Sequence, residues 1–145
     1  MTLLELKKAE VDEITAFYEK EFKDGWTKGM LISAFDGGRF FALGIKDDGD
    51  LVGVITFSIS YDDADIEGVV VRKDKRRSGI ASALIRGAEE KLSALNIKKI
   101  LLEVREKNAP ARALYEKFNF QMVSVRKNYY ADGENAVVML KEIVE

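Results

Sequence analysis

The chain has 145 residues, 47% of them hydrophobic, and a formal net charge of -2, which predicts one domain over residues 1–145 and no general affinity for nucleic acid. It contains neither cysteine nor histidine, so disulfide frameworks, thiol nucleophiles, histidine triads and the usual zinc sites are excluded, and no metal is expected. No apolar run is long enough to cross a bilayer, and we expect a soluble cytoplasmic protein without a membrane partner.

The first half of the chain predicts one strand, two helices and three further strands. Residues 2–8 alternate like a strand, and apolar residues recur at helical spacing over 11–22 and again over 27–35, where Thr27 is a candidate helix cap. Strand patterns follow over residues 40–46, 51–60 and 64–72. Gly68 in the last of these predicts a bulge or a point where another backbone or a ligand comes close.

The second half predicts alternating helices and strands. A helix over 79–95 carries a set of apolar residues at helical spacing on one face, and a strand over 99–104 leads to Asn108, a candidate cap with Pro110 in the first helical turn. Strands over 120–129 and 136–140 flank a turn-rich segment at 132–135. This order, without linker or repeat, predicts an α/β protein with a mixed sheet.

The stretch RRSGIA, residues 76–81, is the strongest chemical signal. It follows the apolar run Val69–Val71 and begins a predicted helix. Glycine and small neighbours let backbone N–H groups approach an anion, and a helix start adds unpaired donors and the positive end of the dipole. A pyrophosphate site is therefore predicted, with a solvated basic loop as the structural alternative.

The block from Val69 to Leu140 resembles the GCN5-related N-acetyltransferases, whose signature is Arg/Gln-x-x-Gly-x-Gly/Ala. The segments LEVREKNAPARALYEKFNF and RKNYYADGENAVVML are similar to the RimI type, the ribosomal-protein alanine N-acetyltransferases. The dinucleotide and P-loop fingerprints are missing. The resemblance implies the GNAT acyl-CoA N-acyltransferase fold, with about seven mixed strands flanked by about four helices.

The resemblance also implies acetyl-CoA as the acetyl donor. The backbone of the run Arg76, Arg77, Ser78, Gly79, Ile80, Ala81 and Ser82 is expected to hold its pyrophosphate. The strand residues Val69, Val70 and Val71 are expected beside the pantetheine arm and acetyl group, and the helix cap Asn108 is expected to contact the coenzyme. For Asn108, a role as helix cap alone is the structural alternative.

Two residues are implied as catalysts and one as an auxiliary. Glu103 points away from the side chains of Leu102 and Val104, and the resemblance makes it the general base; an ion pair with Arg105 is the alternative. Tyr115 is implied as the acid that protonates the leaving thiolate, although a tyrosine near an apolar helix face is more often a core residue. Glu67, on the strand beside the proposed acetyl site, is a second candidate base or amine ligand.

The acceptor is the least certain part of the prediction. Trp26 and Tyr130 match residues that line the acceptor groove of RimI-type enzymes, and the acidic residues at 62, 63, 65 and 67 can attract a cationic acceptor. Gly25 stands where the RimI type has proline, and Arg72-Lys73 stands where it has Asp-Pro. The departures leave the acceptor open.

The sequence thus predicts an acetyl-CoA-dependent N-acetyltransferase acting on the α-amine of a basic protein amino terminus, by direct transfer because no cysteine exists. A small-molecule amine acetyltransferase, for example for polyamines, and a non-catalytic acyl-CoA-binding module remain alternatives. Either a monomer or a homodimer is compatible with the sequence.

Overall fold

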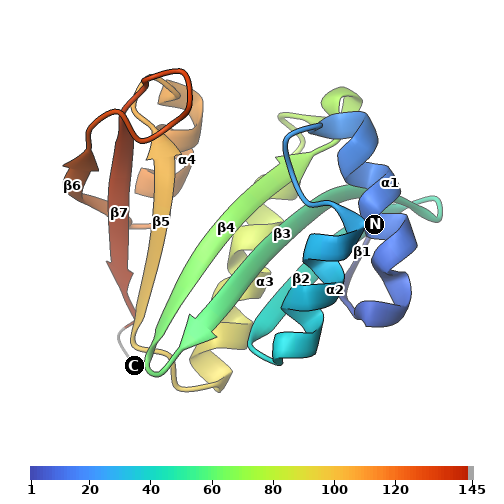
Figure 1. Cartoon of the computed structure of the whole chain (residues 1–145). Coiled ribbons are helices and arrows are strands. Elements are labelled where there is room, and N and C mark those ends of the chain that lie inside the picture. The colour runs from blue at the N-terminus through green and yellow to red at the C-terminus, as the bar shows by residue number, and fades with distance from the viewer. Residues whose placement is uncertain (144–145) are drawn as a thin grey trace.

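A computed structural model describes residues 1–143 and contains one mixed sheet with helices on both faces (Figure 1). The strands are β1 (Thr2–Leu6), β2 (Phe40–Asp47), β3 (Asp50–Ser60), β4 (Asp63–Val71), β5 (Lys99–Arg105), β6 (Gln121–Arg126) and β7 (Ala136–Glu142). The helices are α1 (Val11–Glu21), α2 (Lys28–Gly37), α3 (Ile80–Ala94) and α4 (Ala109–Lys117), with short 3-10 turns at Lys8–Glu10 and Lys73–Lys75.

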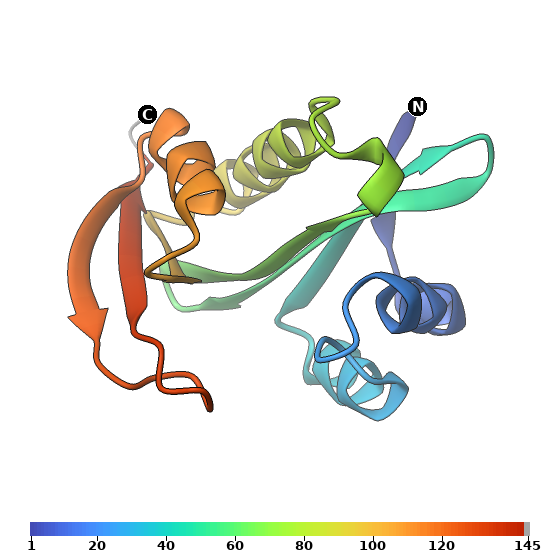
Figure 2. The ribbon, with the colours of Figure 1, turned by 90° about the horizontal axis from the view of Figure 1, so that it is seen from above.

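The sheet has the order β1-β2-β3-β4-β5-β7-β6, in which β4 and β5 are the only parallel neighbours among the described strands. The predicted α/β class and the mixed sheet are confirmed. Helices α3 and α4 cover one face, and α1 and α2 cover the other (Figure 2). Strand β3 is buried on both faces, because Val52 and Ile55 pack in the cluster around α3 while Val54 packs in the cluster around α1 and α2.

A bulge changes the alternation of β4. Thr56 of β3 is paired with Gly68, whereas the next residue, Phe57, is paired with Ile66, so Glu67 is the additional residue. The predicted irregularity at Gly68 is confirmed. Because one residue is inserted, Ile66 and Val69 both face the α3 side of the sheet.

Two predicted strands end earlier than expected. Strand β1 stops at Leu6 because residues 8–10 form a 3-10 turn, where the backbone N–H of Lys7 donates to Glu10 Oε2 at 2.9 Å. Strand β6 stops at Arg126, since Asn128 has a φ of 52°, which is incompatible with an extended strand. The connection from β6 to β7 is therefore a longer loop than the predicted hairpin turn.

The predicted start of α2 is confirmed. Thr27 Oγ1 accepts a hydrogen bond from the backbone N–H of Met30 at 3.2 Å. None of the helices within residues 1–143 has the length and apolar character that crossing a bilayer requires.

Candidate active site

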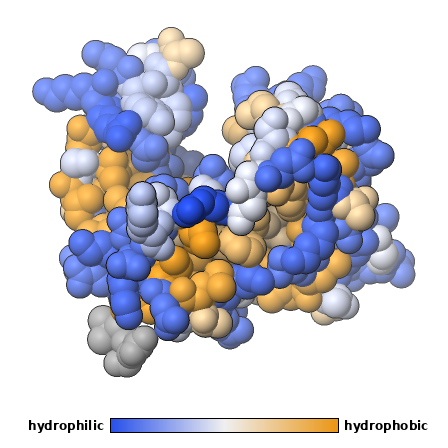
Figure 3. Space-filling view, turned by 60° about the horizontal axis from the view of Figure 1, so that its bottom comes forward, coloured by the Kyte–Doolittle hydropathy of each residue, from blue (hydrophilic) through white to orange (hydrophobic). Residues whose placement is uncertain are grey.

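The parallel strands β4 and β5 separate halfway along their length. Their pairing runs from Asp63 with Lys99 to Ile66 with Leu102 and then ends. Beyond this point the two strands diverge (Figure 1), and the space-filling view shows the molecule hollowed between two raised lobes (Figure 3). The edge of β4 from residue 67 to 71 that faces β5 thus has no strand partner among the described residues, which leaves backbone groups available to a ligand.

The RRSGIA segment forms a tight turn into α3. Arg77 has a φ of 63° and Gly79 a φ of 82°, both in the left-handed region. Glycine adopts this conformation without the cost that a Cβ imposes, and Gly79 occupies the N-cap position of α3. The Ser78 hydroxyl donates to the carbonyl of Lys75 and ties the turn to the preceding 3-10 turn.

The backbone N–H groups of this turn suit an anion. No acceptor within residues 1–143 receives a hydrogen bond from the N–H groups of residues 77–82, and the first bond of the helix runs from Ala83 N to Gly79 O at 3.0 Å. Ile80 is buried in the core, so the start of the helix is held firmly. Free N–H groups, the helix dipole and the exposed Arg76 and Arg77 together fit a pyrophosphate.

Residues 69–71 of β4 lie between this turn and the opening. Val69 and Val71 pack toward α3, and Val70 packs toward α1 and α2. A Cβ built on Gly68 meets no atom within 4 Å, so this position faces open space. Packing within the protein therefore does not explain why residue 68 is glycine, whereas the close approach of a bound group would explain it.

Tyr115 is a buried residue of α4, on the face of the sheet that α3 and α4 cover (Figure 2). Its side chain is 8% exposed, and its ring packs edge-on against Phe120 at a centroid distance of 5.8 Å. Burial, with a smaller contribution from Tyr130, raises the pKa of Tyr115 to about 12. The phenol therefore keeps its proton at neutral pH. Asn108 Oδ1 caps α4 by accepting from the N–H of Ala111 at 3.2 Å.

Glu103 lies on the opposite face of the sheet from Tyr115 and has two partners that the sequence did not suggest. Arg126 Nε is 3.1 Å from its Oε2, and the Tyr129 hydroxyl donates to its Oε1 at 3.2 Å. The alternative of an ion pair with Arg105 is wrong. Arg105 binds Asp132 and Glu134 instead, at 2.8 and 2.9 Å, because the loop between β6 and β7 folds over it.

The same loop brings Tyr130 beside the opening. The guanidinium carbon of Arg105 lies 4.0 Å from the centroid of the Tyr130 ring, and the ring of Tyr129 packs edge-on against it at 5.1 Å. Burial raises the pKa of Tyr130, and the charge on Glu103 adds to this effect while Arg105 opposes it. Tyr130 thus lies near enough to interact electrostatically with both Glu103 and Tyr115.

Glu67, the residue inserted at the bulge, projects on the same face as Glu103. Its carboxyl is reached by solvent, yet surrounding protein atoms limit its hydration, and this partial burial raises its pKa; Ser58 opposes the shift and Asp65 adds to it. A carboxylate with a raised pKa binds a proton or an ammonium group more readily than an ordinary glutamate.

Trp26 is half-buried and fills a gap in the core around α1 and α2. Its ring lies 5.0 Å from that of Phe40, and its Nε1 donates to Thr56 Oγ1 at 3.2 Å. Since Thr56 is paired with Gly68, the indole also adjoins the bulge. Trp26 therefore packs against the core and also adjoins the bulge at Gly68.

The structure adds residues that carried no local signal. They are the partners of Glu103 and the polar groups around the bulge, namely Arg126, Tyr129, Tyr18 and Thr56. Pairing between strands and helices distant in the chain brings them together, so only the Asn-Tyr-Tyr segment could have pointed to Tyr129 in advance.

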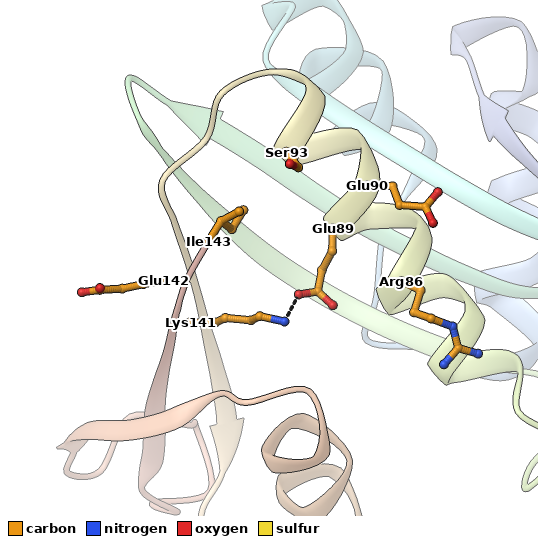
Figure 4. Close-up of a pocket in the computed structure, with 7 residues that line it drawn as sticks. All are labelled: Arg86, Glu89, Glu90, Ser93, Lys141, Glu142 and Ile143. Carbon is orange, nitrogen blue, oxygen red and sulfur yellow. Dashed lines mark ion pairs between the residues drawn. The ribbon is translucent and has the colours of Figure 1, made fainter. Parts of the chain in front are cut away.

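A second hollow lies far from this opening. It is formed by the C-terminal half of α3 and the end of β7, where Lys141 forms an ion pair with Glu89 (Figure 4). Its lining includes Arg86, Glu90, Ser93, Glu142 and Ile143, none of which is a predicted site residue.

Comparison with known proteins gives consistent results. Residues 7–120 match the acetyltransferase (GNAT) family. A Bacillus subtilis protein provisionally named ribosomal protein bS18-alanine N-acetyltransferase is 33% identical over 94% of this chain and 91% of its own length. An N-alpha-acetyltransferase of Saccharolobus solfataricus is 43% identical over 54% of the chain and 47% of its own length. The crystal structure of the ribosomal-protein-S18-alanine N-acetyltransferase from Escherichia coli superposes with a TM-score of 0.90 at 26% identity, covering 99% of this chain and 94% of that one.

Proposed function

Because the chain belongs to the acetyltransferase (GNAT) family, we propose that it transfers the acetyl group of acetyl-CoA to the α-amine of a protein amino terminus. The names of its relatives support this class of acceptor. One observation carries the proposal: the opening between β4 and β5 has the free N–H groups of the α3 turn and Tyr115 on one side of the sheet and two carboxylates on the other.

The coenzyme would lie on the α3 and α4 side. The N–H groups of residues 77–82 would bind its pyrophosphate, with Arg76 and Arg77 adding positive charge. The free edge of β4 at Val69–Val71 would bind the amides of the pantetheine arm and polarise the thioester carbonyl. Asn108, at the start of α4, lies on this face of the sheet as well.

The acceptor would enter from the opposite face. Its neutral amine would attack the thioester carbonyl, so that the C–N bond forms and the C–S bond breaks. Glu103 would take the amine proton through a water molecule, and Glu67 would bind the ammonium form that arrives. Tyr115, which keeps its proton at neutral pH, would protonate the departing thiolate.

Arg126 does not prevent Glu103 from acting as a base. The side chain of Arg126 is 60% exposed, and an exposed ion pair of this kind contributes little stability. An arriving amine can therefore replace it, while Tyr129 holds the carboxylate in position.

An α-amine also suits a site with such simple acid and base groups. Its pKa of about 8 leaves a useful neutral fraction at physiological pH, whereas a lysine side chain at about 10.4 is almost fully protonated. Carboxylates acting through water are sufficient to deprotonate an α-amine, whereas a lysine side chain would need more assistance.

Mass spectrometry of acceptors incubated with the protein and acetyl-CoA tests the proposal. The panel contains basic peptides with free alanine, serine or methionine termini, the same peptides with blocked termini and an internal lysine, and spermidine. We expect one acetyl group on the free termini. Acetylation of spermidine or lysine alone would replace the proposal by the small-amine or lysine alternative. Tight acetyl-CoA binding without any product would favour the non-catalytic module.

A further inference from the structure

The loop between β6 and β7, residues 127–135, is held by polar contacts and not by the hydrophobic core. None of its residues is buried. Two backbone hydrogen bonds close its turn, from Tyr130 N to Glu134 O at 3.1 Å and from Gly133 N to Tyr130 O at 2.8 Å. A segment without buried apolar side chains takes its position from its polar partners. The residues that bind this loop therefore decide where its side chains lie.

Arg105, the last residue of β5, anchors the loop with a single side chain. Its Nη1 donates to Asp132 Oδ2 at 2.8 Å and to Glu134 Oε1 at 2.9 Å. Its guanidinium carbon also lies 4.0 Å from the centroid of the Tyr130 ring. A single exposed ion pair contributes little, whereas a guanidinium that binds two carboxylates and an aromatic ring forms a network.

The two carboxylates of this network are ionised at neutral pH. The backbone N–H of Lys107 lowers the pKa of Glu134, and Arg105 lowers it further. The backbone N–H of Glu134 lowers the pKa of Asp132, and Arg105 again adds to the effect. Each carboxylate thus has a fixed backbone donor besides the guanidinium, and the network has a defined geometry.

The anchored loop places a hydrogen-bond donor on the proposed base. The ring of Tyr129 packs edge-on against that of Tyr130 at 5.1 Å, and its hydroxyl donates to Glu103 Oε1 at 3.2 Å. The charge on Glu103 raises the pKa of Tyr129, so the phenol keeps its proton and remains the donor. Arg105 follows Glu103 by two residues on β5, yet it reaches that carboxylate through the two tyrosines.

Building on the proposed function, we propose that Arg105 is a positioning residue for the base. Arg105 holds the loop, the loop holds the Tyr129 hydroxyl against Glu103, and this hydrogen bond fixes the carboxylate in the orientation that accepts the amine proton. Glu103 is exposed, so without the donor its side chain samples several rotamers and is aligned in only some of them.

Steady-state kinetics of Arg105→Gln test this order of contacts. With a peptide that has a free amino-terminal alanine, kcat should fall about tenfold, as in Tyr129→Phe, while the Kd for acetyl-CoA is unchanged. Combining both changes should cost no more than about twofold beyond either one, because both remove the same hydrogen bond. Lys8→Gln, which loses an exposed pair with Asp36, is the matched control and should keep full kcat. Losses that multiply in the double variant would overturn the inference.

Glu134→Ala distinguishes the position of the loop from the charge of Arg105. It removes an anchor on the loop side and leaves the guanidinium on β5. We expect this variant to lose kcat as Arg105→Gln does. Full kcat in Glu134→Ala beside a low kcat in Arg105→Gln would mean that Arg105 acts on Glu103 by its charge, which would overturn the inference.

A titration that requires no acetyl transfer completes the test. Nuclear magnetic resonance of isotope-labelled tyrosine rings follows the pKa of Tyr129, whose neighbours are Glu103 on β5, Arg126 on β6 and Tyr130 in the loop. In Arg105→Gln this pKa should fall toward the ordinary value of about 10, because the hydroxyl leaves Glu103. An unchanged pKa in the folded variant would overturn the inference. Failure of the unaltered protein to acetylate any peptide would overturn the proposed function, whatever the titration gives.

Discussion

At the scale of single residues, the candidate site combines side chains whose pKa values are shifted by their surroundings. Tyr115 is buried among apolar neighbours and keeps its proton, whereas Glu67 and Asp65 are exposed carboxylates whose pKa is raised by partial burial and by neighbouring carboxylates. A site that must hold a proton in one place and bind an ammonium group in another requires this division.

Removing the Tyr115 hydroxyl tests the role of the acid. Tyr115→Phe should lower kcat by about 10²-fold, the usual contribution of one general acid, while the Kd for acetyl-CoA changes little. Steady-state kinetics and calorimetric titration measure the two quantities. Tyr61→Phe is the matched control because that side chain is 91% exposed. If Tyr115→Phe retained full turnover, the proton for the thiolate would have to come from another group.

The roles of Glu103 and Glu67 can be distinguished by the pH dependence of the kinetics of their glutamine variants. Glu103→Gln should lower kcat/KM most at acidic pH, where the acceptor amine is mainly protonated and most needs a base. Glu67→Gln should chiefly raise the KM for the acceptor. A loss in Glu103→Gln that is equal at every pH would indicate a structural role, and the opposite pattern in the two variants would exchange their assignments.

The raised pKa of Asp65 also predicts a stability effect. Between the ordinary and the raised pKa the folded state binds more protons than the unfolded chain, so stability falls as pH rises through this window and the cost persists at pH 7. Asp65→Asn should therefore increase the free energy of unfolding at neutral pH, by at most about 1 kcal/mol because the group is exposed.

Urea denaturation at several pH values measures this effect. The gain from Asp65→Asn should disappear near about pH 3, where aspartate is protonated in both states. Asp36→Asn, which loses only its surface pair with Lys8, should show no gain at neutral pH. A destabilised Asp65→Asn variant at pH 7 would show that repulsion between Asp65 and the carboxylates of Glu103 and Asp63 does not destabilise the fold.

At the scale of elements, the turn before α3 and the bulge of β4 each perform one task. The turn uses the left-handed residues Arg77 and Gly79 to aim consecutive N–H groups outward. The bulge inserts Glu67 so that Val69 and Val71 return to the core face while the carboxylate remains beside the opening. Both features interrupt regular structure at the point where a ligand needs backbone groups.

A pair of glycine variants separates ligand binding from backbone strain. Gly79→Ala should cost about 1 kcal/mol of stability and weaken acetyl-CoA binding severalfold or more, because a Cβ is strained at its φ of 82° and tilts the N–H groups. Gly49→Ala has nearly the same strain at φ 85° in a distant turn and should leave the Kd unchanged. Equal Kd values for acetyl-CoA in both variants would show that the phosphates do not bind at this turn.

At the scale of the whole molecule, the two parts of the sheet are linked by a short pairing. Four register pairs, from Asp63 with Lys99 to Ile66 with Leu102, join β4 to β5. Beyond them the sheet divides, so that under the proposed function donor and acceptor would approach the same point from opposite faces. This arrangement suits a direct transfer, since neither substrate has to leave before the other binds.

Hydrogen exchange tests this arrangement over the whole chain. Acetyl-CoA should slow exchange at the N–H groups of residues 77–82 and along the free edge of residues 67–71, because these groups become hydrogen-bonded. Exchange in α2, on the other face of the sheet, should change little and provides an internal control. Protection confined to the hollow between α3 and β7 would show that the coenzyme binds there and not at the opening between β4 and β5.

Much of this site could be predicted from local patterns. The Thr27 and Asn108 caps, the turn at residues 76–81 and the bulge at Gly68 follow from preferences of a few neighbouring residues, and each has its expected conformation. The early ends of β1 and β6 could not be predicted, because a 3-10 turn and the left-handed Asn128 compete with strand pairing at those positions.

The sequence by itself determined the order of elements and the turn at residues 76–81, since local propensity and spacing specify these features, and its resemblance to the GNAT family supplied the acid and base candidates. Only the tertiary structure decided that Arg126 and Tyr129 hold Glu103 and that Arg105 pairs with Asp132 and Glu134. These contacts join segments far apart in the chain, and the end of the β4 and β5 pairing that creates the site depends on how the entire sheet twists and packs.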